Sequence, residues 1–329
     1  MHSESRLNLF QQLAIATVLA TLFLIFIGGL VRASGAGLGC PDWPRCWGTW
    51  WPPGGVAEID ATRYDVSLFN PVKMWTEYVN RLIGVTIGLF ITATFLASFR
   101  YRKSRPVIFW GALASLLLVM FEGWLGALVV RSGLHQGMIT AHMFVAVVLV
   151  SLLLYITFLA HEDRWQEEVS PKLQQRLMKV AILLYLASMV QVVLGSQVRE
   201  TLGEIHRAFP EMPRTEWIEE AGWIDHIHRS FSWLILFCGL YLTLQIRKEP
   251  GASKLRQVVY VTAALIVFQI ALGIGLVYGG MPWILQLLHT GSSAVLICAE
   301  SLVILLLRSA KPHPEVTSQA EWSPAVRLP

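Results

Sequence analysis

The chain has 329 residues, of which 54% are hydrophobic and only 15% are charged. Soluble domains carry about 25% charged residues, so this composition indicates a protein that lies largely in lipid. The net charge of +4 is small, and no basic stretch is interleaved with aromatic residues, which argues against nucleic acid as a partner.

Several apolar segments are long enough to cross a bilayer, whose hydrocarbon core needs about 20 residues per helix. The first is followed by no small-residue cleavage site, so it is interpreted as a retained helix rather than a signal peptide. The chain is therefore predicted to be an all-α, multi-pass integral membrane protein with eight transmembrane helices. These helices are expected at residues 10–32, 77–99, 106–130, 136–160, 177–199, 224–246, 257–279 and 282–307.

The distribution of Lys and Arg predicts the orientation, because cytoplasmic loops are enriched in these residues. The basic loops are residues 100–105, 161–176 and 247–256. Both termini are therefore predicted to be cytoplasmic. The two long loops, 33–76 and 199–223, are expected on the outward side.

The ends of the odd-numbered helices repeat a glycine-containing pattern, and the even-numbered helices correspond as well. Asn80 in the second helix corresponds to His228 in the sixth, each followed by arginine, and His142 in the fourth corresponds to His289 in the eighth. Such a repeat predicts a duplicated unit, here two pseudo-symmetric four-helix bundles. The repeated ends are IGGLVR (27–32), LGALVVR (125–131), LGSQVR (194–199) and LGIGLVY (272–278).

The repeat also predicts the domain organisation. Residues 1–160 form the N-terminal half and residues 177–310 the C-terminal half. Residues 161–176 are assigned to a cytoplasmic linker, and residues 311–329 to a cytoplasmic tail.

Two histidines at matched depth on alternate helices, His228 and His289, are candidate ligands of a heme iron. An ionisable residue inside a membrane helix is costly and indicates a functional site. Imidazoles that face each other across a bundle are a common way to bind heme iron. Zinc fits less well, because it needs more nitrogen, sulfur or oxygen ligands than this pair supplies. An interhelical hydrogen bond is the alternative for each histidine alone.

Arginines lie at the outward ends of several helices. Arginine pairs bidentately with carboxylates, so these side chains are candidates to bind porphyrin propionates. Snorkelling of the guanidinium to the membrane interface is the alternative explanation. The propionate candidates are Arg32, Arg131, Arg199 and Arg229.

The first outward loop contains the segment GCPDWPRCWG (39–48), with Cys40 and Cys46 close together. Because this loop faces the oxidising side of the membrane, we predict a disulfide between them. The disulfide could brace a lid or exchange with a redox partner. Cys238 and Cys298 lie in the middle of helices and are interpreted as small buried hydrophobic residues.

Several separated segments together resemble the heme A synthase family of cytochrome oxidase assembly proteins. They occur in the same order as in that family, and the resemblance extends across all eight helices. The resemblance implies oxidation of the C8 methyl group of heme O to the formyl group of heme A, in a bacterial cytoplasmic membrane. It implies a permanent heme b between His228 and His289, and a substrate heme near Glu77 and His142. The segments are GGLVRASGAGLGCPDWPRCWG (28–48), EYVNRLIG (77–84), VVRSGL (129–134) with His142, IHRSFSW (227–233) and LLHTGSSA (287–294).

Asn80 departs from the family pattern, which has histidine at this position. The substrate iron would therefore have one protein ligand fewer. In one interpretation the open axial position helps the substrate to enter and leave. In the other, the protein has lost its chemistry and only carries heme. Retention of Glu77, Arg81, His142 and the cysteine pair favours the first interpretation.

The predicted mechanism is two successive oxidations at one methyl carbon, with Glu77 as the catalytic residue. Its carboxylate would act as a general base or stabilise a developing cation, with Asn80 and Arg81 lining the same pocket. Electrons would leave through the C-terminal heme to an unidentified acceptor. The expected partners are heme O, the lipid bilayer, the farnesyltransferase that makes heme O and a second copy of the chain.

Two other functions share part of this pattern. A two-heme membrane cytochrome or a heme carrier would use the same histidines without altering either porphyrin. A transporter is a more distant alternative, because transporters also contain internal repeats. The sequence argues against it, since no helix is interrupted by Pro or Gly near the bilayer midplane in both halves.

Overall fold

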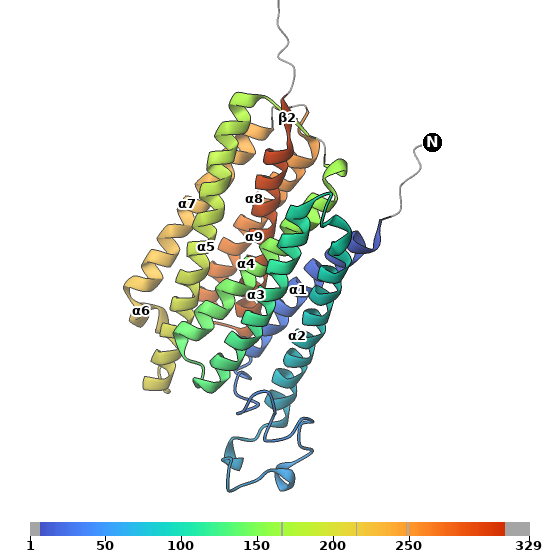
Figure 1. Ribbon diagram of the computed structural model, residues 1–329. Coiled ribbons are helices and arrows are strands. Elements are labelled where there is room, and N and C mark those ends of the chain that lie inside the picture. Colours follow the sequence, from blue (N-terminus) through green and yellow to red (C-terminus); the bar gives the residue numbers. More distant parts are fainter. Residues whose placement is uncertain (1–6, 166, 215, 248, 250, 313–329) are drawn as a thin grey trace, which may run out of the picture.

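The computed structural model describes residues 7–165, 167–214, 216–247, 249 and 251–312 (Figure 1). In this part of the chain, eight helices are long and apolar enough to cross a membrane, which confirms the predicted all-α fold with eight spans. They are α1 (Leu9–Ala33), α2 (Pro71–Ser98), α3 (Pro106–Arg131), α4 (Gln136–Ala160), α5 (Pro171–Ala208), α7 (Trp223–Ile246), α8 (Ser253–Tyr278) and α9 (Trp283–Ser309).

Two helices extend well beyond the predicted apolar segments. α2 begins at Pro71, where the Asn70 side chain accepts a hydrogen bond from the Lys73 amide at 3.1 Å. α5 runs from Pro171 to Ala208, so it includes part of the expected linker and of the second outward loop. The extensions of α5 contain several charged residues, and that of α2 contains Pro71 and Lys73, so neither prolongs an apolar run although the helix continues.

The remaining elements are short. The 3₁₀ helices are η1 (Val56–Glu58), η2 (Val66–Leu68), η3 (Phe99–Tyr101) and η4 (Glu162–Arg164), and one further helix is α6 (Trp217–Ala221). Strands β1 (Glu168–Val169) and β2 (Lys311–Pro312) pair in parallel, with Glu168 opposite Lys311. This pairing attaches the chain after α9 to the connection between the two halves. The predicted tail, residues 311–329, lies outside the described residues beyond Pro312.

The spanning helices form two rings of four. In the first, α1, α2, α3 and α4 each contact the next, and α4 contacts α1. In the second ring the order is α5, α7, α8 and α9, and α9 contacts α5. The rings meet where α1 and α4 pack against α9 and where α4 packs against α5. As a result α2 and α4 are diagonal partners in one ring, and α7 and α9 in the other.

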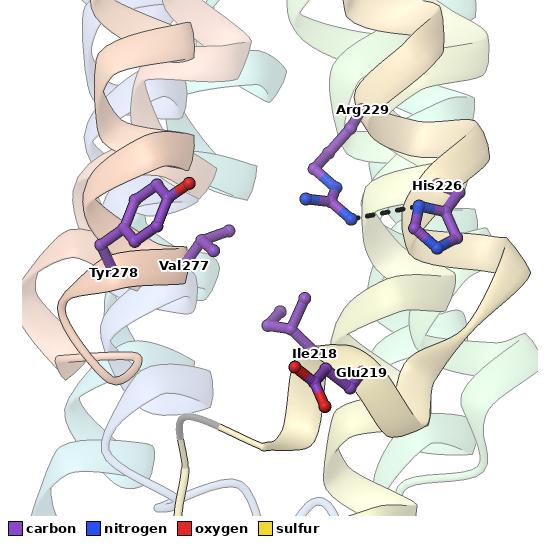
Figure 2. Close-up of a pocket in the computed structure, with 6 residues that line it drawn as sticks. All are labelled: Ile218, Glu219, His226, Arg229, Val277 and Tyr278. Atoms are coloured by element: carbon purple, nitrogen blue, oxygen red, sulfur yellow. Dashed lines mark hydrogen bonds between the residues drawn. The ribbon is translucent and has the colours of Figure 1, made fainter.

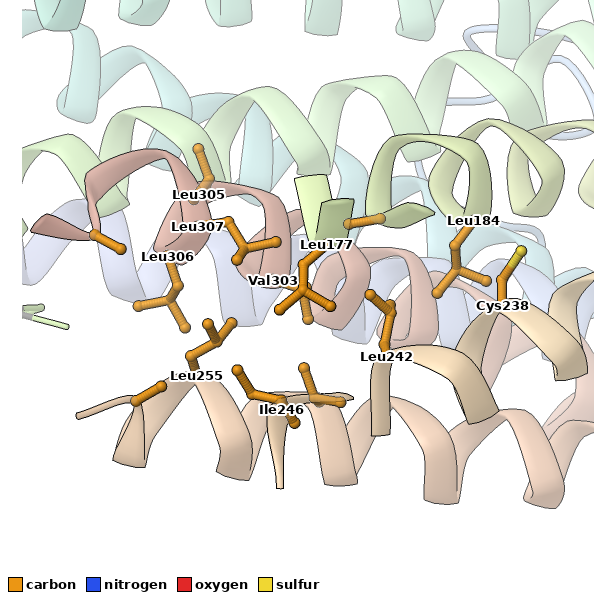
Figure 3. Close-up of a cluster of buried hydrophobic side chains, with 14 of the residues drawn as sticks. Leu177, Leu184, Cys238, Leu242, Ile246, Leu255, Val303, Leu305, Leu306 and Leu307 are labelled. Atoms are coloured by element: carbon orange, nitrogen blue, oxygen red, sulfur yellow. The ribbon is translucent and has the colours of Figure 1, made fainter. Parts of the chain in front are cut away.

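Each ring is packed with large apolar side chains at one end. In the C-terminal half this cluster includes Leu177, Ile246 and Leu255, which come from the start of α5, the end of α7 and the start of α8 (Figure 3). The N-terminal half has its own cluster, with Phe10 from the start of α1 and Ile156 from the end of α4. Both clusters lie at the end of the molecule where the described chain begins and ends (Figure 1). The candidate histidines lie toward the other ends of their helices, and Glu77 and Arg81 contact the loop of residues 34–70.

Candidate functional site

The two histidines of the C-terminal half face each other across the diagonal of their ring. The ring centres of His228 on α7 and His289 on α9 are 6.4 Å apart, with an angle of 72° between the planes. A metal lies about 2.0–2.1 Å from an imidazole nitrogen, so two rings that share one ion have centres about 6.3 Å apart. The Nδ1 atoms of both rings are buried without a hydrogen-bond partner among the described residues. The spacing and the donors therefore fit a heme iron between the two imidazoles.

Glycines on the neighbouring helices make room for these rings. A Cβ atom on Gly195 of α5 would lie 3.0 Å from Cε1 of His228, and one on Gly273 of α8 would lie 3.8 Å from Cε1 of His289. Both glycines belong to the repeated helix-end pattern. The pattern therefore has a steric function, because the absence of a side chain lets each imidazole lie against the next helix.

Two glutamines that the sequence analysis did not single out support the same histidines. Gln191 Nε2 donates to the main-chain oxygen of His228 at 2.9 Å. Gln269 Nε2 donates to the main-chain oxygen of His289 at 3.1 Å and to Ser292 Oγ at 2.9 Å. Each glutamine stands four residues before a glycine of the repeated pattern, which is the signal that could have identified it.

The N-terminal half places one histidine in the equivalent position. His142 on α4 lies against Gly126 of α3, where a Cβ atom would be 3.4 Å from Cε1 of the ring. Its Nδ1 is 3.1 Å from Oε1 of Glu122, a buried carboxylate on α3. The ring orientation nevertheless leaves Nδ1 without a formed hydrogen bond. Glu122 is a single acidic residue in an apolar helix, and its place four residues before Gly126 is the signal that could have identified it.

Asn80 stands where an imidazole stands in the C-terminal half. Its Oδ1 atom is buried and has no hydrogen-bond partner among the described residues. Gly28 on α1, the counterpart of Gly195, has open space around the position that a Cβ atom would occupy. At these positions the N-terminal half thus has one imidazole, His142, and one amide, Asn80. It also has open space at Gly28, on the helix next to that of Asn80.

Glu77 and Arg81 connect α2 to the first outward loop. Glu77 is buried, and its Oε2 accepts a hydrogen bond from the Cys40 amide at 2.9 Å while its Oε1 pairs with Arg81. The Arg81 guanidinium also donates to three main-chain oxygens of that loop. These bonds are 3.1 Å to Cys40, 2.8 Å to Asp42 and 2.9 Å to Arg45. The pair therefore holds the loop onto the outward end of the N-terminal half.

The loop contains the predicted disulfide between Cys40 and Cys46, which the structure confirms. Asp42 organises the turn, because its carboxylate accepts hydrogen bonds from the Trp47 amide at 2.6 Å and the Gly48 amide at 3.0 Å. The Tyr64 hydroxyl donates to the same carboxylate at 3.2 Å. Burial, and then the charge of Asp42, raise the pKa of Tyr64, so the hydroxyl keeps its proton at neutral pH.

The four propionate candidates lie in different surroundings. Arg32 pairs with Glu200 of α5 and contacts Met143 Sδ, so it joins the two halves. Arg131 is exposed and Arg199 is partly buried, and neither makes a side-chain hydrogen bond or ion pair with the described residues.

Arg229 lines a cavity of about 540 Å³ at the outward end of the C-terminal half (Figure 2). Its guanidinium is 2.7 Å from Asp225 Oδ2 and 3.2 Å from His226 Nδ1. The opposite wall of the cavity consists of Val277 and Tyr278 from the end of α8 (Figure 2). A cation therefore stands beside space that a carboxylate group could enter, on the same helix as His228.

The chain is similar to known proteins along most of its length. The COX15-CtaA family model, described as cytochrome oxidase assembly protein, matches residues 11–300. The heme A synthase of Shewanella oneidensis is 25% identical over 315 residues, which cover 85% of this chain and 91% of that protein. The heme A synthase of Shouchella clausii is also 25% identical, over 81% of this chain and 86% of the relative. A shorter match, to the heme A synthase of Geobacillus thermodenitrificans, is 30% identical over 45% of this chain and 41% of that protein.

Proposed function

Because the chain belongs to the COX15-CtaA family of cytochrome oxidase assembly proteins, we propose that it converts heme O to heme A by oxidising the C8 methyl group of the porphyrin. The observation that carries the proposal is the asymmetry between the halves. One half has two facing imidazoles with ring centres 6.4 Å apart, and the other has a single imidazole opposite an amide position. This difference suits a resident heme in one half and an exchangeable substrate heme in the other.

In this proposal His228 and His289 hold heme b in the C-terminal half. When bound there, heme b supplies one-electron transfer. The Gln191 and Gln269 side chains hold the main chain at both histidines, which keeps the two rings in place. Arg229, beside the cavity at the end of α8, is the best-placed propionate partner in this half.

The substrate heme O occupies the N-terminal half, with His142 as the protein ligand of its iron. Asn80 leaves the opposite axial position without a protein ligand, and this eases exchange of substrate and product. The disulfide loop, held by Glu77 and Arg81, covers the outward end of this half. Arg131 and Arg199 stay candidate partners of the substrate propionates.

The chemistry proceeds by two oxidations at one carbon, first to the alcohol and then to the hydrated aldehyde, which loses water. With water as the proposed oxygen donor, each oxidation removes one electron pair and two protons in total from the carbon and the water molecule. Glu77 is the proposed base or stabiliser of positive charge, because its carboxylate is buried and fixed by the Cys40 amide and Arg81. An external acceptor takes the electrons from the C-terminal half.

The protein is proposed to lie in the bacterial cytoplasmic membrane with both termini in the cytoplasm. The disulfide loop then faces the oxidising side, where such bonds persist. The farnesyltransferase that supplies heme O and a second copy of the chain remain predicted partners.

A heme carrier or a two-heme cytochrome is the second candidate function. Two observations favour it: Asn80 replaces a ligand position, and both oxygens of Glu77 already have protein partners. The two functions differ in the pigment that the protein contains. We expect acid–acetone extracts of protein purified from cells that make heme O to contain heme A or hydroxylated heme O beside heme b. Heme b alone, from cells with ample heme O, would contradict the synthase proposal.

The ligand assignment has a separate test. His228→Met and His289→Met should each abolish or convert the low-spin bis-imidazole spectrum of the C-terminal half. His226→Met is the matched control, because His226 is on the same helix but its Nδ1 contacts Arg229 instead. A bis-imidazole spectrum unchanged in the His228 or His289 variant would refute the assignment.

A further inference from the structure

A polar side chain accompanies each of the inward-facing histidines. It stands four residues before the glycine against which the imidazole lies. Gln191 precedes Gly195 and faces the helix of His228, and Gln269 precedes Gly273 and faces that of His289. The equivalent positions in the N-terminal half are Glu122, opposite His142, and Leu24, on the helix next to Asn80. The polar residue is therefore present where a histidine is present and absent where it is not.

The two glutamines and the glutamate contact different parts of their histidines. Each glutamine donates its amide hydrogen to the main-chain oxygen of the histidine. Within the described part of the chain, the ring Nδ1 atoms of His228 and His289 have no hydrogen-bond partner. An ionised carboxylate has no hydrogen to donate, so Glu122 cannot make this bond. Its Oε1 lies 3.1 Å from the ring Nδ1 of His142 instead. Gln191 and Gln269 thus contact the main chain of their histidines, whereas Glu122 contacts the imidazole ring of His142.

We propose that Glu122 is a positioning residue, which accepts a hydrogen bond from Nδ1–H of His142 and so presents Nε2 to the iron of the substrate porphyrin. This inference rests on the proposed function, because His142 is taken as the ligand of that porphyrin. In this structure Nδ1 and Oε1 are 3.1 Å apart, which is within hydrogen-bond distance, although the bond is not formed. Catalytic hydrogen bonds are often poorly aligned until the ligand is bound.

The contact matters most in the half that has one histidine. A carboxylate that accepts the second N–H of a metal-bound imidazole sets its tautomer and orientation and makes it a stronger electron donor. In the proposed function His228 and His289, whose ring centres are 6.4 Å apart, bind one iron together, whereas the position that corresponds to His228 in the N-terminal half is Asn80. Glu122 therefore strengthens a ligand that has to hold the substrate without a second imidazole, and the axial position next to Asn80 stays open.

The test compares full-length variants loaded with ferrous heme b as the probe of the N-terminal half. A five-coordinate ferrous heme with one histidine ligand has an iron–histidine stretching band in its resonance Raman spectrum, and a bis-histidine heme has none. Glu122→Gln keeps the size of the side chain and reproduces the residue of the C-terminal half. Glu122→Leu reproduces the residue of α1. We expect the band to shift to lower frequency in both variants, and heme b to be retained about 10–100-fold less tightly by this half.

Two controls separate this effect from misfolding and from the proposed function. Gln269→Leu alters the equivalent position in the other half and should leave the iron–histidine band unchanged. The low-spin spectrum of the C-terminal half should be normal in both Glu122 variants, which shows that they fold. If the band and heme retention in Glu122→Gln and Glu122→Leu equal those of the wild type, the inference is overturned while His142 remains the ligand. If the loaded wild type has no such band, both the ligand assignment of His142 and the inference fail.

Discussion

Glu77 lies where the disulfide loop meets α2, with one oxygen on the Cys40 amide and the other on Arg81. Glu77→Gln keeps a hydrogen-bond acceptor for Cys40 and removes the charge. Heme O should still bind, while heme A formation falls about 10²–10⁴-fold, the usual contribution of a general acid or base. The measurement is heme O and heme A content by chromatography of extracted pigments.

Glu58→Gln is a suitable control for this prediction, because Glu58 lies in the same loop and accepts a hydrogen bond from the Gly54 amide. Heme A production by Glu77→Gln at the wild-type rate would mean that Glu77 only holds the loop. Loss of the Cys40–Cys46 disulfide in that variant would point to the same structural role.

Substitution of Asn80 tests whether this position faces the iron of the substrate heme. Asn80→His restores the pattern of the C-terminal half, and the open space beside Gly28 can accept the imidazole. A second ligand should hold the substrate iron more tightly and shift it from high spin to low spin, with turnover equal or slower. Heme content and the reduced absorption spectrum measure this. Unchanged occupancy and spin state would show that position 80 does not face the iron.

At the scale of helices, glycines determine how closely an imidazole approaches the neighbouring helix. A Cβ atom on Gly195 would lie 3.0 Å from the His228 ring, which is too close, whereas one on Gly273 would make an ordinary 3.8 Å contact with His289. Gly195→Ala should therefore displace His228 and lower the content of low-spin heme b. Gly273→Ala is the matched control and should retain it. Equal heme b content in both variants, by pyridine hemochrome assay, would contradict this steric explanation.

The helix boundaries show which elements the sequence could predict. The eight spans were predicted because long apolar runs identify them, and the repeated helix ends predicted which helices correspond. The extensions of α2 to Pro71 and of α5 to Ala208 were not predicted, because Pro71 and Lys73 interrupt the apolar run before α2 and charged residues follow the apolar run of α5. A helix in water is maintained by capping and tertiary packing, which hydropathy does not report.

At the scale of the whole molecule, the ion pair between Arg32 of α1 and Glu200 of α5 connects the two halves. Both side chains are largely buried, at 19% and 11% exposed, so removal of one leaves the other as an unpaired charge. Arg32→Met should lower the free energy of unfolding by about 3–5 kcal/mol. The double variant Arg32→Met/Glu200→Gln should recover much of this loss, as measured by thermal unfolding in detergent.

A surface ion pair is the control for this prediction. Arg105 and Asp163 are 3.9 Å apart and their side chains are 41% and 89% exposed, so Asp163→Asn should cost less than about 1 kcal/mol. Equal destabilisation by Arg32→Met and Asp163→Asn would mean that the buried pair does not hold the halves together.

The orientation of the molecule in the membrane gives the last prediction. Thr62 is in the exposed outward loop, and Lys103 is in the connection between α2 and α3 at the opposite end. A membrane-impermeant maleimide applied to intact spheroplasts should label Thr62→Cys, and it should label Lys103→Cys only after lysis. The native cysteines do not interfere, since Cys40 and Cys46 are bonded and the other two are buried. The reverse labelling pattern would place the termini outside.

The sequence by itself determined the number of spans, the duplication and the histidines at matched positions. The spans are long apolar runs, and the repeated helix ends and histidines occur at corresponding positions of the two halves. The same pattern in one half therefore supports its interpretation in the other. It also predicted the disulfide, because the two cysteines are close in the chain and the Lys and Arg distribution predicted an outward position for their loop. Only the tertiary structure decided that Glu122 contacts His142, that Glu77 and Arg81 hold the loop and that Arg32 pairs with Glu200. Such contacts join helices that are distant in the sequence or depend on how side chains turn, and no local pattern encodes which partners the packing brings together.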